Sequence, residues 1–217
     1  MKLPFLLLLV AITGCKKQAE TPQASQVTNN WFFENAGVQA EVPFDFDTGI
    51  QFKYWSTYPN DVEKQRVLAA FSDRYGVSLP EDFKQLIGDV VEGGFDGTYQ
   101  VAMDGENSIE WWRLLSFGDP AVAGAPQSEA GTDTYFAATI LEENPSLFHG
   151  VDGSLLYVPF GRAYRFGPSD TGTSGFLAFD LLTPGRIVWV ATGSDAPVVI
   201  GESFRAMLEQ STFLHYG

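Results

Sequence analysis

The sequence has few of the residues that most metal centres and many enzymes depend on. Among its 217 residues there is one cysteine, Cys15, and there are two histidines, His149 and His215. A single thiol forms no internal disulfide, and neither histidine has a second ligand at the spacing of a zinc site. We therefore expect no metal site and no cofactor.

Basic residues are also scarce. The chain has 13 lysines and arginines against 27 aspartates and glutamates, which gives a formal net charge of -14. A field of this sign repels phosphate backbones and anionic lipid, and it speeds association with a basic protein. We expect no nucleic-acid partner. The charge fits either a basic protein partner or the plain need of an exported protein to stay soluble.

The apolar run at the start of the chain is too short to cross a bilayer. Leu3 to Ala11 is apolar throughout. A spanning helix needs about 20 apolar residues, whereas the hydrophobic part of a secretory signal needs roughly 7 to 15. Residues 1–14 are therefore predicted to be a signal peptide.

The four residues Ile12-Thr13-Gly14-Cys15 resemble the lipobox of bacterial lipoproteins. The resemblance implies cleavage before Cys15, a diacylglycerol thioether on its sulfur, and acylation of the new amino terminus with a chain such as palmitate. Two or more acyl chains make a lasting anchor, whereas one holds a protein only marginally. Lys16 resembles lipoproteins sent to the outer membrane, so we expect an envelope protein that faces the periplasm. The alternative is that Cys15 is a free or buried thiol.

The next two segments differ sharply in composition. Residues 15–30 contain almost nothing that a core could bury, and they predict a flexible linker after the lipidated cysteine. Residues 31–59 form an aromatic-rich extension, whose apolar residues alternate on either side of Gly49 and predict a hairpin over residues 43–55. The pattern is compatible with an extension that joins the sheet of the main domain or packs elsewhere.

The main domain, residues 60–217, begins with two predicted helices. Apolar residues recur at helical spacing from Asn60, a capping residue, to Gly76. A second helix follows Pro80, and the pair Gly93-Gly94 is expected to end it.

Strand periodicity then dominates as far as residue 200. The predicted strands are TYQVAMD, SIEWWRLLSF, SLLYVPFG, GFLAFDLL and GRIVWVAT. The segment GESFRAMLEQS closes the chain with a helix, and TYFAATILEENPSLF is ambiguous between helix and strand. This order predicts an α+β fold, an antiparallel sheet with the two N-terminal helices and the C-terminal helix packed on one face.

Several of these segments together resemble the SUKH superfamily, which includes fungal cell-wall assembly regulators and bacterial toxin-immunity proteins. They are RYGVSLPEDFKQLIGDVVEGG, LLYVPFG, GFLAFDL, GRIVWV and IGESFRAMLEQ, and they span roughly residues 60 to 212. The family usually has a short turn after Pro-Phe-Gly, whereas this chain has the longer RAYRFGPSDTGTS. The resemblance implies a SUKH-like fold and a role in binding a protein partner.

No pattern of catalytic residues stands out. The sequence has no Gly-x-Ser-x-Gly elbow, no phosphate-binding loop and no dinucleotide fingerprint. A pair of carboxylates could act as acid and base, as in glycosidases, but with 27 carboxylates the possibility is uninformative. We predict no catalytic residues and no enzymatic activity.

Candidate partner-binding residues are aromatic or basic. Adjacent strand residues point to opposite faces, so one of Trp111 and Trp112 is expected in the core, and Trp112 is the candidate for contact. Arg162, Tyr164 and Arg165 are conspicuous in an acidic protein and are assigned to a loop. Trp, Tyr and Arg dominate binding hot spots, although helices could equally cover the tryptophan and nearby carboxylates could pair the arginines.

We expect a membrane-anchored immunity protein that occludes a secreted, possibly basic, toxin domain. A rival interpretation is an envelope assembly factor that binds a resident envelope protein or wall polymer. A hydrolase that uses carboxylates is a third.

Overall fold

A computed structural model describes residues 38–103, 107–118, 136–167, 170–191, 193 and 196–216. The predicted signal peptide, Cys15, the linker and the start of the aromatic extension lie outside these residues.

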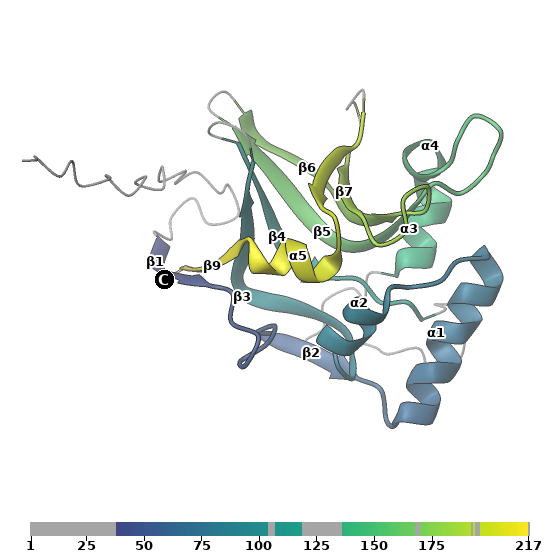
Figure 1. The fold of residues 1–217 in the computed structure, drawn as a ribbon, viewed down its shortest axis with the longest axis horizontal. Coiled ribbons are helices and arrows are strands. Elements are labelled where there is room, and N and C mark those ends of the chain that lie inside the picture. The colour runs from purple at the N-terminus through teal and green to yellow at the C-terminus, as the bar shows by residue number, and fades with distance from the viewer. Residues whose placement is uncertain are drawn as a thin grey trace, which may run out of the picture.

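The described residues form a nine-stranded antiparallel sheet and five helices (Figure 1). The sheet order is β1-β9-β3-β4-β5-β6-β7-β8, and β2 pairs with β3 beside this path. The strands are β1 (Val38–Pro43), β2 (Tyr54–Thr57), β3 (Val90–Ala102), β4 (Ser108–Leu114), β5 (Tyr157–Gly167), β6 (Asp170–Asp180), β7 (Ile187–Val190), β8 (Val198–Gly201) and β9 (Ser211–Tyr216). The predicted α+β class with an antiparallel sheet is therefore confirmed.

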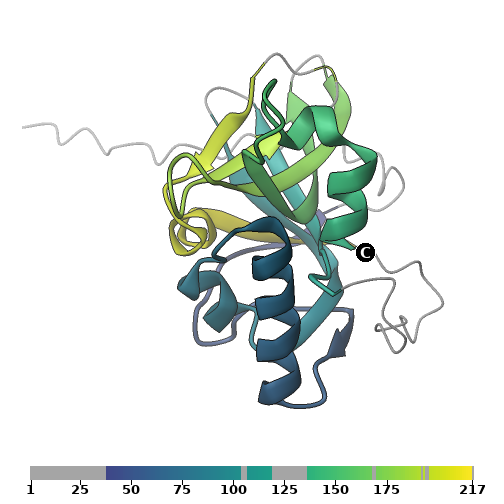
Figure 2. The same ribbon diagram turned by 90° about the vertical axis from the view of Figure 1, so that its right-hand side faces the viewer.

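The sheet is strongly curled, as Figures 1 and 2 show from two directions. The helices are α1 (Asp61–Tyr75), α2 (Glu81–Leu86), α3 (Ala137–Glu143), α4 (Pro145–Phe148) and α5 (Phe204–Glu209). In Figure 1, α1 and α2 lie at the lower right of the molecule, and α3 and α4 lie above them on the right-hand side. The ambiguous segment before Pro145 is thus helical.

Helix α1 begins and ends where its sequence predicts. The Asn60 side chain accepts a hydrogen bond from the Glu63 N–H at 2.9 Å, which satisfies one of the free donors of the first turn. Gly76 closes the helix in the left-handed region, with φ at 65°. Leu68 and Phe71 are buried on its inner side.

Helix α2 is shorter than predicted. It ends at Leu86, and Gly88 then takes a φ of 59°. Gly93 and Gly94 do not end the helix, because both lie inside β3 and pair with β2 on one side and β4 on the other. The prediction for these two glycines was wrong because paired glycines are equally suited to a strand that passes close to its neighbours.

The C-terminal end of α2 is held by a lysine from α1. The Lys64 ammonium donates to the carbonyl oxygens of Gly88 and Lys84, the latter at 3.4 Å, and lies 3.5 Å from the Asp89 carboxylate. A cation here also interacts favourably with the negative end of the helix dipole.

We predict that Lys64→Met lowers the free energy of unfolding by about 1.5 to 3 kcal/mol, because charged hydrogen bonds to carbonyls are lost at a largely buried position. Urea unfolding measures the change. Arg66→Met is the matched control, since Arg66 makes only an exposed pair with Glu63 and its loss should leave the midpoint unchanged. Equal effects of the two variants would contradict this role of Lys64.

The extension joins the main sheet, but the predicted hairpin over residues 43–55 is wrong. Strand β1 pairs with β9, and β2 pairs with β3, so the two strands do not pair with each other. The turn at Gly49 is real, with its N–H donating to the Asp45 carbonyl at 2.9 Å. The apolar residues between the strands, Phe44, Phe46, Ile50 and Phe52, pack against the core.

Tyr99 of β3 ties this segment to the core. Its ring lies 5.8 Å from that of Phe44, and its hydroxyl accepts a hydrogen bond from the Gln51 N–H at 2.7 Å. Burial raises the pKa of Tyr99 to about 12, so the hydroxyl stays protonated over the physiological range.

Strand β9 was not predicted. It follows α5 directly and lies between β1 and β3 in the sheet. The close approach of β9 and β3 needs Gly97, because a Cβ there would collide with the Leu214 carbonyl oxygen.

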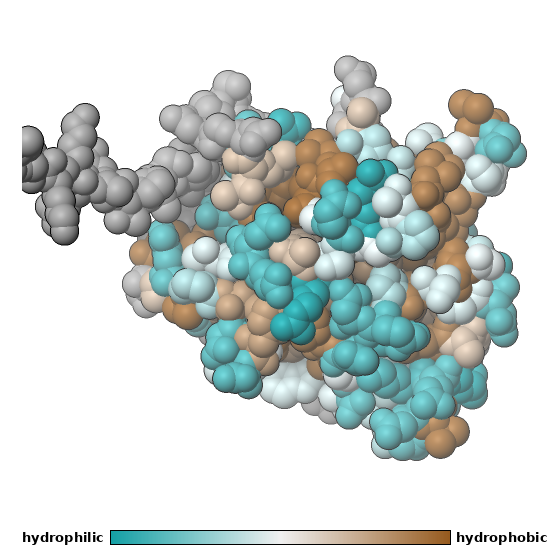
Figure 3. Space-filling model, in the orientation of Figure 1, coloured by the Kyte–Doolittle hydropathy of each residue, from teal (hydrophilic) through white to brown (hydrophobic). Residues whose placement is uncertain are grey.

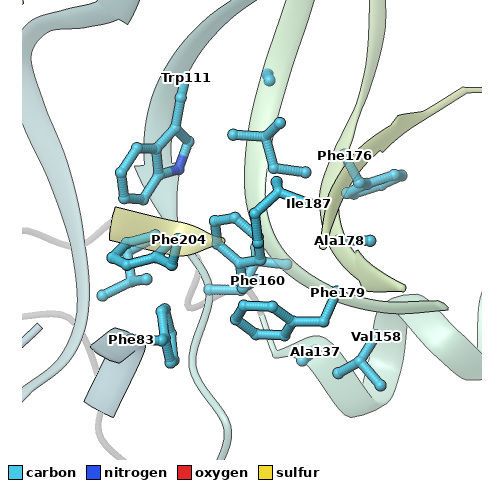
Figure 4. Close-up of a cluster of buried hydrophobic side chains, with 14 of the residues drawn as sticks. Phe83, Trp111, Ala137, Val158, Phe160, Phe176, Ala178, Phe179, Ile187 and Phe204 are labelled. Atoms are coloured by element: carbon cyan, nitrogen blue, oxygen red, sulfur yellow. The ribbon is translucent and has the colours of Figure 1, made fainter. Parts of the chain in front are cut away.

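Aromatic rings from helices and strands form the centre of the core (Figure 4). Phe83 of α2 lies 5.0 Å from Phe204 of α5 and 5.0 Å from Phe179 of β6. Phe160 of β5 stacks on Phe179 at 4.6 Å and meets Trp111 of β4 edge-on. Both helices therefore rest on side chains of the sheet.

Candidate interaction surface

The four residues predicted to bind a partner lie on two neighbouring strands. Trp112 is on β4, and Arg162, Tyr164 and Arg165 are on β5. The assignment of residues 162–165 to a loop is wrong, because β5 and β6 continue as paired strands through this segment. The aromatic residues Tyr164 and Phe166 stand two residues apart in RAYRFG, and this spacing was the signal that could have shown a strand.

A β-bulge at Trp112 decides which side chains face the core. Trp111 pairs with Ala163 and Arg113 pairs with Arg162, so Trp112 is the extra residue between them. Since residues 162 and 163 are adjacent on β5, Trp111 and Arg113 lie on opposite faces of the sheet. Trp111 is buried in the core, as the prediction for one of the two tryptophans required.

Trp112 and Tyr164 stack on each other on the side away from Trp111. Their ring centroids are 6.1 Å apart, with an interplanar angle of 15°. Trp112 is half-buried and Tyr164 is buried. The pair therefore contributes little exposed area to a partner.

Arg162 and Arg165 point to opposite faces of the sheet. Arg162 lies over the Phe176 ring at 5.3 Å from its centroid. Arg165 pairs with Ile109, a core residue, and lies over Trp189 at 5.9 Å. Trp112, Arg162 and Tyr164 thus share one face, and Arg165 does not belong to it.

Buried charges stand beside these three residues, and sequence reasoning missed them. Arg113 pairs with Glu92 of β3 at 3.3 Å, and each side chain is 3% exposed. The Thr98 hydroxyl donates to the Glu110 carboxylate at 3.0 Å in the same buried layer. The residues belong to β3 and β4, and the pairing of these two strands brings them together.

We name the residues of this layer the β3–β5 cluster: Glu92, Thr98, Glu110, Trp112, Arg113, Arg162 and Tyr164. Glu92, Glu110 and Arg113 are buried, and the cluster contains the Arg113–Glu92 ion pair and the Thr98–Glu110 hydrogen bond. A charge removed from water is stable only with a partner, so the cluster acts first as a support of the sheet.

We predict that Arg113→Leu lowers the free energy of unfolding by about 3 to 5 kcal/mol, because Glu92 is left buried without its cation. The double variant Arg113→Leu with Glu92→Leu should recover part of that loss, since no charge then has to be desolvated. Urea unfolding of both variants provides the measurement. A double variant no more stable than the single one would contradict this account.

The exposed charge lies elsewhere, over the helices and turns. Many described cations are engaged by carboxylates, in the pairs Arg66–Glu63, Arg74–Glu142, Lys84–Glu81, Arg186–Asp180 and Arg205–Glu209. Further exposed carboxylates are those of Glu41, Asp45, Asp47, Asp61, Asp73, Glu143, Asp152 and Glu202. Figure 3 shows hydrophilic residues spread over the lower half of the molecule, where α1, α2 and α5 lie.

The pKa values of two surface carboxylates are lowered by hydrogen bonds. A hydrogen bond from Arg66 lowers the pKa of Glu63, and hydrogen bonds from Ser154 lower the pKa of Asp152. Both shifts favour the ionised form. The described surface carries an excess of exposed carboxylates.

The described residues hold no group of three or more His, Cys, Asp or Glu side chains that could bind a metal ion. His149 lies after α4, with its ring nitrogen 3.3 Å from the Pro145 carbonyl oxygen, and His215 lies in β9 against the Phe213 ring. The two histidines are thus in separate elements and serve no common site.

Comparison of the chain with protein-family models, with curated proteins and with solved structures finds no match. Across the described ranges, no helix has the length and apolar character that a membrane span requires.

Proposed function

We propose that this chain is a lipid-anchored, periplasm-facing binding protein of the bacterial envelope, which neutralises a basic secreted toxin domain by covering it. The observation that carries the proposal is the charge distribution. Many of the described cations are taken up by internal pairs, and exposed carboxylates remain in excess.

The proposed fold is SUKH-like, with α1, α2 and α5 on one face of the sheet. A chain of ring contacts supports it: Phe71 of α1 meets Phe117, Phe117 meets Phe83 of α2, and Phe83 meets Phe204 of α5. The residues that carry the family resemblance at α2 have structural roles, because Leu79 and Phe83 are buried.

The proposed mechanism is stoichiometric binding. Complementary charge raises the rate of encounter and selects a basic partner, while close packing at the interface sets the lifetime of the complex. A lipid anchor on Cys15 would hold the neutralising domain at the membrane, where an incoming toxin arrives.

The function is tested by protection of cells. The secreted protein encoded by the neighbouring reading frame is expressed in the periplasm with and without this chain. We expect survival only with the chain, and a complex recovered at low salt. Equal killing in both cases, with no complex, would contradict immunity to that toxin, and a stable complex without protection would favour an envelope assembly factor.

Charge reduction tests the steering step. The variant Glu41→Gln, Asp47→Asn, Asp73→Asn, Glu202→Gln should bind the same partner with an association rate about tenfold lower at low ionic strength. Stopped-flow mixing measures the rate. The difference should shrink at high salt, where screening removes the field of both proteins. A rate that is unchanged at low salt would show that these carboxylates do not steer the partner.

The anchor is tested by Cys15→Ser. Without the sulfur no thioether forms, so the protein should move from the membrane pellet to the soluble fraction after cell lysis and ultracentrifugation. Lys16→Ala keeps the cysteine and should leave the protein in the membrane pellet. Continued sedimentation of Cys15→Ser with membranes would contradict lipidation.

A further inference from the structure

Strand β2 has an open edge among the described residues. It pairs with β3 through Tyr54–Gly94, Trp55–Gly93 and Ser56–Glu92, and with no other described strand. Figure 1 shows β2 as the outermost strand on the lower side of the sheet. An open edge carries backbone donors and acceptors that a strand from another protein can pair with.

This edge also carries an exposed tryptophan. Trp55 is 54% exposed, whereas Trp111 and Trp189 are buried. The residue directly opposite Trp55 is Gly93, which offers no side chain to pack against. An aromatic ring on a neighbouring strand can cover a glycine, as the Trp55 ring could cover Gly93. That role alone does not explain why half of the Trp55 surface is exposed to water.

The chain segment that contains β2 is acidic on balance. Residues 43–63 contain Asp45, Asp47, Asp61 and Glu63 against one cation, Lys53. Beside the end of β2, the Asp89 carbonyl accepts a hydrogen bond from the Tyr58 N–H at 2.9 Å, and the Asp89 side chain, which lies 3.5 Å from the Lys64 ammonium, is 65% exposed. A second copy of this acidic chain is repelled here, and a strand that carries lysine or arginine is attracted.

We propose that β2 is the docking edge for a basic strand of the partner, with Trp55 as its anchor. The incoming strand adds antiparallel or parallel to β2 by main-chain hydrogen bonds, and an arginine or lysine of that strand lies over the Trp55 ring. This inference rests on the proposed function, since it assigns the place on the protein where the basic partner binds.

The probe for this edge is a peptide of alternating arginine and valine, eight residues long and blocked at both ends. It is titrated into the full-length, ¹⁵N-labelled chain in detergent at low salt. We expect shifts of the amide signals of Tyr54 to Thr57 and of the Trp55 indole signal. A glutamate–valine peptide of the same length should cause none.

Substitutions separate the anchor from general attraction. Trp55→Ala should weaken binding of the arginine peptide about tenfold, because a hot-spot aromatic and its cation–π contact are lost. Trp55→Phe should keep part of the affinity. Val199→Ala is the matched control, because Val199 is exposed on β8, the strand at the other end of the sheet, and its loss should have no effect.

The peptide experiments test the docking site separately from the proposed function, which is the binding of a basic toxin domain. The arginine peptide could instead bind elsewhere on the chain, with an affinity that Trp55→Ala does not change. That result would overturn β2 as the docking site but would still agree with a basic partner. Equal binding of both peptides, or none, would also overturn the edge, while the protection experiment judges the function separately. If the chain self-associates and Trp55→Ala abolishes the self-association, a second copy of this chain occupies the β2 edge, and the proposal of a basic strand is wrong.

Discussion

The pairing of one long strand with three others is the constraint on which the rest of the structure depends. Strand β3 has 13 residues, and it pairs with β4 along one edge and with β2 and β9 in succession along the other. Its glycines lie where neighbouring strands approach closely. Gly97 lies against the backbone of β9, and Gly93 and Gly94 pair with β2 on one side and β4 on the other. The extension, the middle of the chain and its C-terminus therefore fold as one sheet.

Local signals were enough to predict the elements that depend on neighbours in sequence. The Asn60 cap, the Gly76 terminator and strand β7 within GRIVWVAT all appear where their residues place them. Strand β9 was not predicted because a segment of six residues after a helix resembles a C-terminal tail. Its partners β1 and β3 are far away in sequence. The hairpin failed for the same reason: alternation shows that strands exist, but it does not show which strands pair.

The candidate site was predictable only in part. Alternation correctly separated Trp111 from Trp112, and it could have separated Tyr164 from Arg165 had the segment been recognised as a strand. The bulge at Trp112 reverses the alternation, so no count along β4 could place Arg113 opposite Trp111. The ion pair of Arg113 with Glu92 joins two strands whose register the sequence does not reveal.

The acidic surface and the open strand edge have a consequence when they are considered together. An exposed edge with a large aromatic ring is a hazard, because copies of the same protein can pair along it and aggregate. Here each copy carries a net charge of -14, so self-association at β2 brings like charges together, whereas a basic strand meets no such cost. Residues 43–63, which contain β2, carry four carboxylates and one cation, Lys53, so this segment is negative on balance. If β2 docks a basic strand as proposed, the same carboxylates would disfavour other copies and select that partner, so specificity would arise from repulsion as much as from attraction.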